Sequence, residues 1–169
     1  MIILPQLLRS LLKEVDDDLA ATLALDFAEQ SLKAWEDPIA SPELTAASIA
    51  YVAAARAFRG SGEADEMRAA HDRFYAARSH AEGRSASATW IAAIAVHAAC
   101  QRDIEKAGIL VRNSYTPTVF DVSAEAQKIA GQFAEGVDES QRARWEAARH
   151  QVILLIDAVR FPSRNRPPG

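Results

Sequence analysis

The side chains best suited to catalysis or metal binding are few, because the chain has four histidines and one cysteine. His97 and Cys100 are three positions apart, which would place them on one face of a helix. A zinc site needs further Cys or His ligands at suitable spacing, and the sequence contains no second pair of this kind. We therefore expect His97 to be a hydrogen-bonded core histidine, Cys100 to be an inert buried thiol, and no metal to bind.

The remaining acidic and basic pairs do not predict a catalytic site. Glu146 and His150 are four positions apart, a spacing typical of a surface pair on a helix. Glu66, His71 and His80 lack the Glu-x-x-His spacing of di-iron bundles. The chain also has no nucleophile elbow and no nucleotide-binding loop. We expect no catalytic residue, no cofactor and no enzymatic activity.

Two short segments could recognise charged partners. The sequence GSGEAD at Gly60–Asp65 places glycines before a helix, as phosphate sites do, but its acidic first turn would repel an anion. Asp16, Asp17 and Asp18 precede another helix, where carboxylates cap free backbone N–H groups. The three aspartates are also our candidate patch for a basic protein partner.

A second hypothesis is a helical bundle that binds a small molecule or catalyses a reaction. Its pocket would be lined by His71, Tyr75, Trp90 and His97. A sizeable cavity with convergent polar groups would favour this hypothesis, and a fully packed core would oppose it.

Helical segments must position all of these residues. About one residue in five is alanine, the strongest helix former, and nearly every position from Ala86 to Cys100 is apolar. A helix that is apolar on all sides must be surrounded by other helices. The pattern predicts an all-α fold, a single compact bundle of about seven mostly antiparallel helices around this segment. The predicted helices span residues 4–15, 19–35, 42–59, 63–82, 86–115 with a weak point at Gly108, 123–135 and 140–159.

Length and composition limit the remaining possibilities. The 169 residues predict one domain over residues 1–160 and a flexible Arg/Pro tail over residues 161–169. The net charge of −4 and pI of about 5.6 disfavour a nucleic-acid partner. The apolar run is too short to span a membrane, and the lone cysteine is typical of a reducing compartment, so we expect a cytoplasmic protein. Residues 113–121 are the longest irregular segment, either a lid or a connector.

The segment VDDDLAATLALDFAEQSLKAWED is followed by a helix ending AAARAFRGSGEA, by two alanine-rich helices and by a tryptophan in the last helix. This arrangement resembles a family of small helical immunity proteins from bacterial polymorphic-toxin systems. The corresponding positions here are Asp18, Ala24, Asp26, Ala28, Glu29, Leu32, Trp35, Glu36, Ala55, Arg56, Ala57, Phe58, Gly62, Glu63 and Trp145. The resemblance implies a protein that binds and silences a toxin, and it assigns no catalytic residue.

These observations leave three hypotheses for the function. The first is a non-enzymatic protein-binding module, most specifically an immunity protein whose acidic surface attracts a basic toxin. The second is the ligand-binding or enzymatic bundle. The third is a structural or regulatory homo-oligomer, which would expose a contiguous apolar patch.

Overall fold

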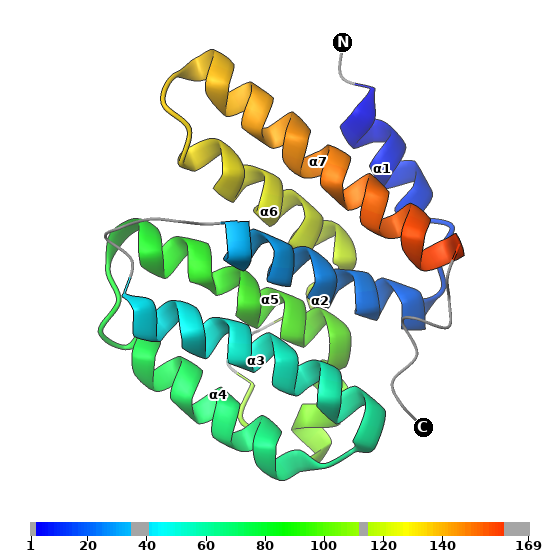
Figure 1. Ribbon diagram of the computed structural model, residues 1–169. Coiled ribbons are helices and arrows are strands. Elements are labelled where there is room, and N and C mark those ends of the chain that lie inside the picture. The colour runs from blue at the N-terminus through cyan, green and yellow to red at the C-terminus, as the bar shows by residue number, and fades with distance from the viewer. Residues whose placement is uncertain (1–2, 35–40, 112–114, 161–169) are drawn as a thin grey trace.

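The computed structural model describes residues 3–34, 41–111 and 115–160. Within these ranges it contains seven α-helices and no strand, which confirms the predicted all-α bundle. The helices are α1 (Leu4–Leu12), α2 (Asp17–Ala34), α3 (Pro42–Ser61), α4 (Ala64–Arg78), α5 (Gly83–Lys106), α6 (Val119–Gln132) and α7 (Val137–Arg160) (Figure 1).

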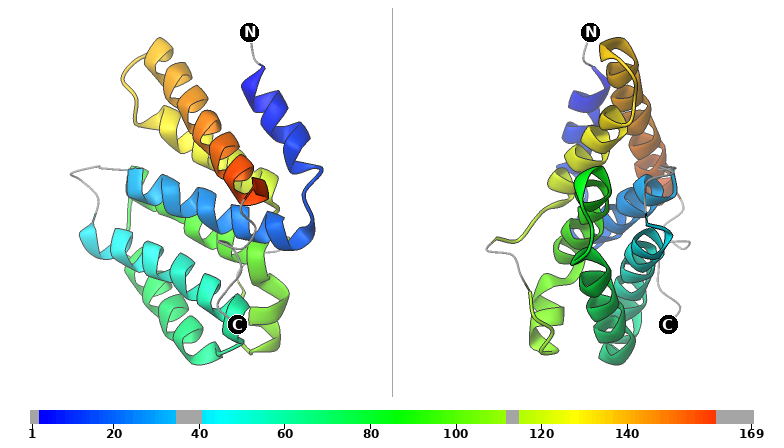
Figure 2. Two further views of the ribbon diagram at one scale, coloured as in Figure 1. Left: turned by 45° about the vertical axis from the view of Figure 1, so that its right-hand side comes forward. Right: turned by 90° about the vertical axis from the view of Figure 1, so that its left-hand side faces the viewer.

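Helices α2 and α5 pack against each other in the middle of the bundle. Helix α3 packs on both of them and carries α4 on its outer side, while α6 packs on the other side of the α2–α5 pair and carries α7. Both views in Figure 2 show this order, with α1 lying beside α7 at the edge. The arrangement places the amino-terminal end of α5 close to α6 and α7.

Small side chains make α5 the buried centre of the bundle, as predicted. Ala92, Ala93 and Ala95 are fully buried, together with the larger Ile91 and Val96. Because alanine projects so little from the backbone, α2, α3 and α6 can pack closely around this one helix. The helix is kinked at Cys100, where φ is −153° and ψ is 28°.

Several predicted helix boundaries were wrong, mainly because a glycine was assigned the wrong role. We expected α3 to end before Gly60, but the helix continues to Ser61, and Gly62 adopts the left-handed terminating conformation with φ of 77°. We expected Gly83 to end α4, but it begins α5. Helix α5 ends at Lys106 rather than near Tyr115, because Gly108 takes a positive φ.

Other sequence predictions lie partly or wholly outside the described residues. These are the Arg/Pro tail at 161–169, two residues of the family resemblance, Trp35 and Glu36, and part of the irregular segment 113–121. The described part of that segment runs into α6, which begins after Thr118 with a capping box to Asp121. None of the described helices is both long and apolar enough to cross a membrane.

Candidate functional site

A cleft of about 930 Å³ lies between the carboxyl-terminal half of α2, the amino-terminal end of α5, and the facing surfaces of α6 and α7. Its size falls in the range of small-molecule sites in proteins. It is lined by Phe27, Gln30, Ser31, Ala34, Glu82, Gly83, Arg84, Ser85, Ala126, Ile129, Ala130, Phe133, Glu135, Ala143, Glu146, Ala147, His150 and Gln151.

Much of the cleft wall is apolar. Phe27 of α2 and Ile129 of α6 are almost completely buried, and Phe133 at the end of α6 is partly buried. Alanines occupy the intervening positions on α6 and α7, so the two helices leave space instead of filling it with large side chains. These surfaces can bind the hydrocarbon part of a ligand.

Gln151 forms the centre of a buried polar network at the cleft. Its side chain is 1% exposed, and its Nε2 donates to the Ser123 carbonyl oxygen at 3.2 Å. Its Oε1 accepts from Ser123 Oγ at 2.8 Å and from Gln127 Nε2 at 3.1 Å. Because the Gln151 side chain both donates and accepts hydrogen bonds with residues of α6, it fixes the register of α7 against α6.

The first turn of α5 lies directly at the cleft. Glu82 precedes the helix in an extended conformation, and no side chain caps the helix at this end. Ser85 is 8% exposed and lines the cleft, and its hydroxyl makes no hydrogen bond to any residue that the structure describes. The cleft wall therefore includes the uncapped first turn of α5 and the hydroxyl of a nearly buried serine.

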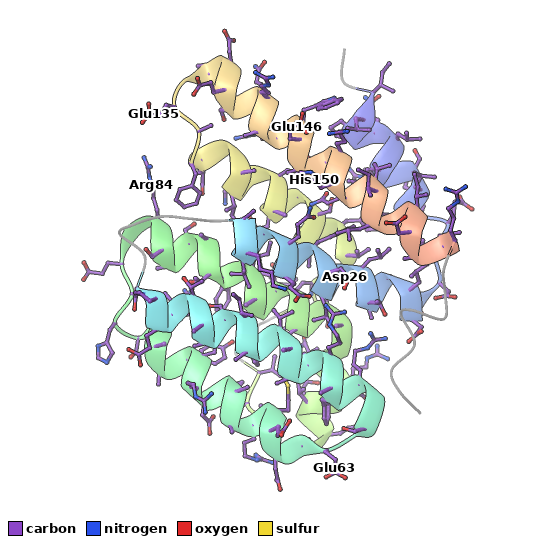
Figure 3. The ribbon with its side chains drawn as sticks, in the orientation of Figure 1. Asp26, Glu63, Arg84, Glu135, Glu146 and His150 are labelled. Carbon is purple, nitrogen blue, oxygen red and sulfur yellow. The ribbon has the colours of Figure 1, made fainter. Side chains whose placement is uncertain are left out.

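Charged side chains surround this apolar interior. Figure 3 shows Arg84 and Glu135 at one end of the cleft, where α5 begins and the α6–α7 connection passes, and Glu146 and His150 along α7. Glu146 pairs with Arg149 outside the cleft at 3.3 Å. Glu82, Arg84 and Glu135 form no ion pair within the described ranges, so they remain available to a ligand.

Three of the four predicted pocket residues meet in a different place, a partly buried aromatic cluster between α3, α4 and α5. The His71 and Tyr75 rings are 4.7 Å apart, and the Tyr75 and Trp90 rings are 6.4 Å apart. Tyr51 of α3 stacks on Phe74 at 4.8 Å at the centre of the cluster. None of the four predicted residues lines the cleft described above.

The two buried histidines have different surroundings. His71 Nε2 lies 3.0 Å from the Leu110 carbonyl oxygen, and Nδ1 lies 3.0 Å from an Asp72 carboxylate oxygen. His97 is buried within α5, and this burial lowers the pKa of its imidazole to about 4. The neighbouring His71 lowers that pKa further, and Glu105 opposes the change. His97 is therefore neutral at physiological pH.

The cysteine is also buried. Cys100 donates from Sγ to the Val96 carbonyl oxygen at 3.4 Å, and burial raises its thiol pKa to about 12. A thiol in this environment is a poor nucleophile, because the thiolate is the reactive form. Within the described ranges, no three His, Cys, Asp or Glu side chains gather where they could hold a metal ion.

The three aspartates of the candidate partner patch lie exposed at the start of α2. Asp16 caps the helix by accepting from the Leu19 N–H at 2.8 Å, and Asp18 pairs with Arg59 of α3 at 2.7 Å. Two of the three therefore have structural contacts, while the Asp17 carboxylate forms no ion pair with any described residue.

Several residues of the family resemblance form an ion-pair network between α2 and α3. Arg56 pairs with Asp26 at 2.7 Å and with Glu29 at 3.0 Å. Burial raises the pKa of the Asp26 carboxyl, and Arg56 partly opposes that rise. The acidic residues of α2 and the arginine of α3 therefore have a structural role, because their ion pairs join the two helices.

The sequence carried little signal for the cleft. Phe27, Ile129 and Ala147 fall at ordinary core positions of amphipathic helices, and a pattern of apolar residues does not show where packing leaves a space. Glu146 and His150 were recognised as a surface pair, but their position beside a cleft depends on how α7 packs against its neighbours.

Comparison with known proteins gives no match for this chain, since no family model, curated protein or solved structure is significantly similar to it.

Proposed function

We propose that this chain is a non-enzymatic binding protein whose ligand is an amphipathic small molecule held in the cleft between α2, α5, α6 and α7. The observation that carries this proposal is the cleft itself, which combines an apolar wall with nearly buried polar groups and a charged rim. Ligand sites in proteins have this combination, because apolar surface supplies affinity and a few polar groups fix orientation. This proposal follows the hypothesis of a ligand-binding bundle, but the cleft is not lined by the residues predicted for its pocket, His71, Tyr75, Trp90 and His97.

A neutral fluorescent probe tests this proposal. N-phenyl-1-naphthylamine should bind with increased fluorescence, and Ala147→Trp should abolish the signal by filling the cleft. Ala69→Trp, at an exposed site on α4, is the matched control and should leave binding unchanged. Equal binding by both folded variants would place the probe elsewhere and contradict the proposal.

A second proposal is the immunity function, in which the protein silences a basic toxin in the bacterial cytoplasm. It is supported by the family resemblance, the net charge of −4, and the exposed aspartates at the start of α2. An acidic surface accelerates association with a basic partner through long-range attraction. Asp17 is the residue best suited to this contact, because its carboxylate is not used in a described ion pair.

Tagged protein should then recover one basic, toxic partner from its native cells in a stoichiometric complex. The purified complex should weaken as salt is raised, and Asp17→Lys should weaken it further. Glu43→Lys, an exposed first-turn substitution on α3, is the control for a general change of charge. A complex that is insensitive to salt and to both substitutions would contradict an electrostatic interface.

A further inference from the structure

We propose that the cleft selects ligands with a single carboxylate, and that the carboxylate binds at the amino-terminal end of α5 while an apolar chain lies against Phe27, Ile129 and Phe133. This inference rests on the proposed small-molecule function and specifies its ligand class. It depends on three features of the α5 terminus: the free N–H groups, the Ser85 hydroxyl and the Arg84 guanidinium.

The backbone of α5 provides the first feature. The N–H groups in the first turn of a helix have no partner within the helix, and they carry a partial positive charge. No side chain caps α5, although its first residues line the cleft. Gly83, with φ of 65°, begins the helix without a side chain that would cover these groups. An acceptor in the cleft can therefore reach them.

The Ser85 hydroxyl provides independent support. A serine hydroxyl in the wall of a cleft can donate one hydrogen bond and accept others. Ser85 is 8% exposed, and none of the described residues accepts from or donates to its hydroxyl. Because Ser85 lines the cleft, its hydroxyl can donate to an acceptor bound there.

Arg84 follows Gly83 at the same end of the cleft and forms no ion pair with a described residue. A guanidinium can donate two hydrogen bonds to one carboxylate. Together with the first-turn N–H groups and Ser85, it gives this end of the cleft several donors for an anionic group.

The acidic rim sets the charge of the ligand. Glu82 and Glu135 are exposed, so salt and water screen their effect on a single negative charge held at α5. A dianionic phosphate would face twice the repulsion from these side chains. The uncapped first turn of α5, the nearly buried Ser85 and the Arg84 guanidinium all present donors at this end, which favours an anion over a cation. A monocarboxylate satisfies both conditions.

A series of ten-carbon ligands that differ only in the head group tests this inference. Decanoate, decanol, decyl phosphate and decyltrimethylammonium would compete with bound N-phenyl-1-naphthylamine at concentrations below micelle formation. We expect decanoate to bind about tenfold more tightly than decanol, which corresponds to a charge-assisted hydrogen bond. We also expect it to bind more tightly than the phosphate and the ammonium compound.

Ser85→Ala and Arg84→Gln should each reduce the preference for decanoate over decanol about three- to tenfold. Arg102→Gln, at an exposed position on the last turns of α5, is the control and should leave the preference intact. Circular dichroism would show that all three variants fold.

The outcomes separate this inference from the function on which it rests. Equal binding of decanol and decanoate, or tighter binding of the phosphate or the ammonium compound, would overturn carboxylate selection while leaving a cleft that binds apolar ligands. An unchanged preference in both Ser85→Ala and Arg84→Gln would overturn the assigned position. Failure of every decyl compound and of the probe to bind would overturn the proposed function as well.

Discussion

At the scale of single residues, His97 makes the stability of the fold depend on pH. Its pKa is about 4 in the folded protein and about 6.5 when the chain is unfolded, so the unfolded state takes up a proton first as the pH falls. The contribution of neutral His97 is therefore complete above pH 6.5 and is lost between pH 6.5 and pH 4. We expect the free energy of unfolding to decrease by about 2 kcal/mol from pH 7 to pH 5.

Urea denaturation at these two pH values would measure the change. His97→Gln removes the titrating group, so its stability should vary much less over the same interval, whatever its stability at pH 7. His80→Gln replaces an exposed histidine and should retain the dependence of the unmodified protein. An identical pH dependence in His97→Gln would show that another group is responsible.

Gln151 is the second residue with a large expected effect. Gln151→Leu has a similar volume but leaves the buried Ser123 side chain without its strongest acceptor, at 2.8 Å. An unsatisfied buried polar group costs about 1–3 kcal/mol, and we expect thermal and urea unfolding to show a loss of this size. Ile153→Gln, on the exposed side of α7, should change stability much less. A fully stable Gln151→Leu would mean that the network contributes little.

At the scale of the helices, the sequence predicted the number and type of elements but not all of their ends. Apolar periodicity identified each helix, because a buried face leaves a strong repeat in the sequence. The glycines at 60 and 62 were ambiguous, since either could end a helix from local sequence alone. Helix α3 ends at the glycine that takes a positive φ, and which glycine does so depends on how the burial of Phe58 positions the end of the helix. The cleft depends on spacing between α6 and α7, which no local pattern encodes.

The same pair of glycines gives a test with opposite signs. Gly60 lies within α3, so Gly60→Ala should stabilise the protein by about 0.5–1 kcal/mol through lower entropy of the unfolded chain and better helix propensity. Gly62 has a φ of 77°, so Gly62→Ala should destabilise it by about 1–2 kcal/mol. Urea denaturation of both variants would measure these changes. Stabilisation by Gly62→Ala, or destabilisation by Gly60→Ala, would contradict the assigned end of α3.

At the scale of the whole molecule, one hydrophobic core connects all seven described helices. Its buried residues run from Leu8 and Leu12 in α1 to Leu155 and Ala158 in α7. Helix α5 joins the two sides of the bundle, because it packs against α2, α3 and α6. Neither α3–α4 nor α6–α7 can separate from the rest without exposing apolar surface of this central helix or of its partner α2.

We therefore expect the chain to unfold in a single cooperative transition. Ellipticity at 222 nm reports on all the helices, whereas tryptophan fluorescence reports on local packing that includes Trp90 in the aromatic cluster and Trp145 on α7. The two signals should give the same urea midpoint, and Trp145→Phe should leave that agreement unchanged. If α1, α6 and α7 formed a separately stable layer, ellipticity would fall in two steps and the fluorescence would follow only part of the loss. The central position of α5 predicts coincident curves, because the core that it completes is shared by both sides of the bundle.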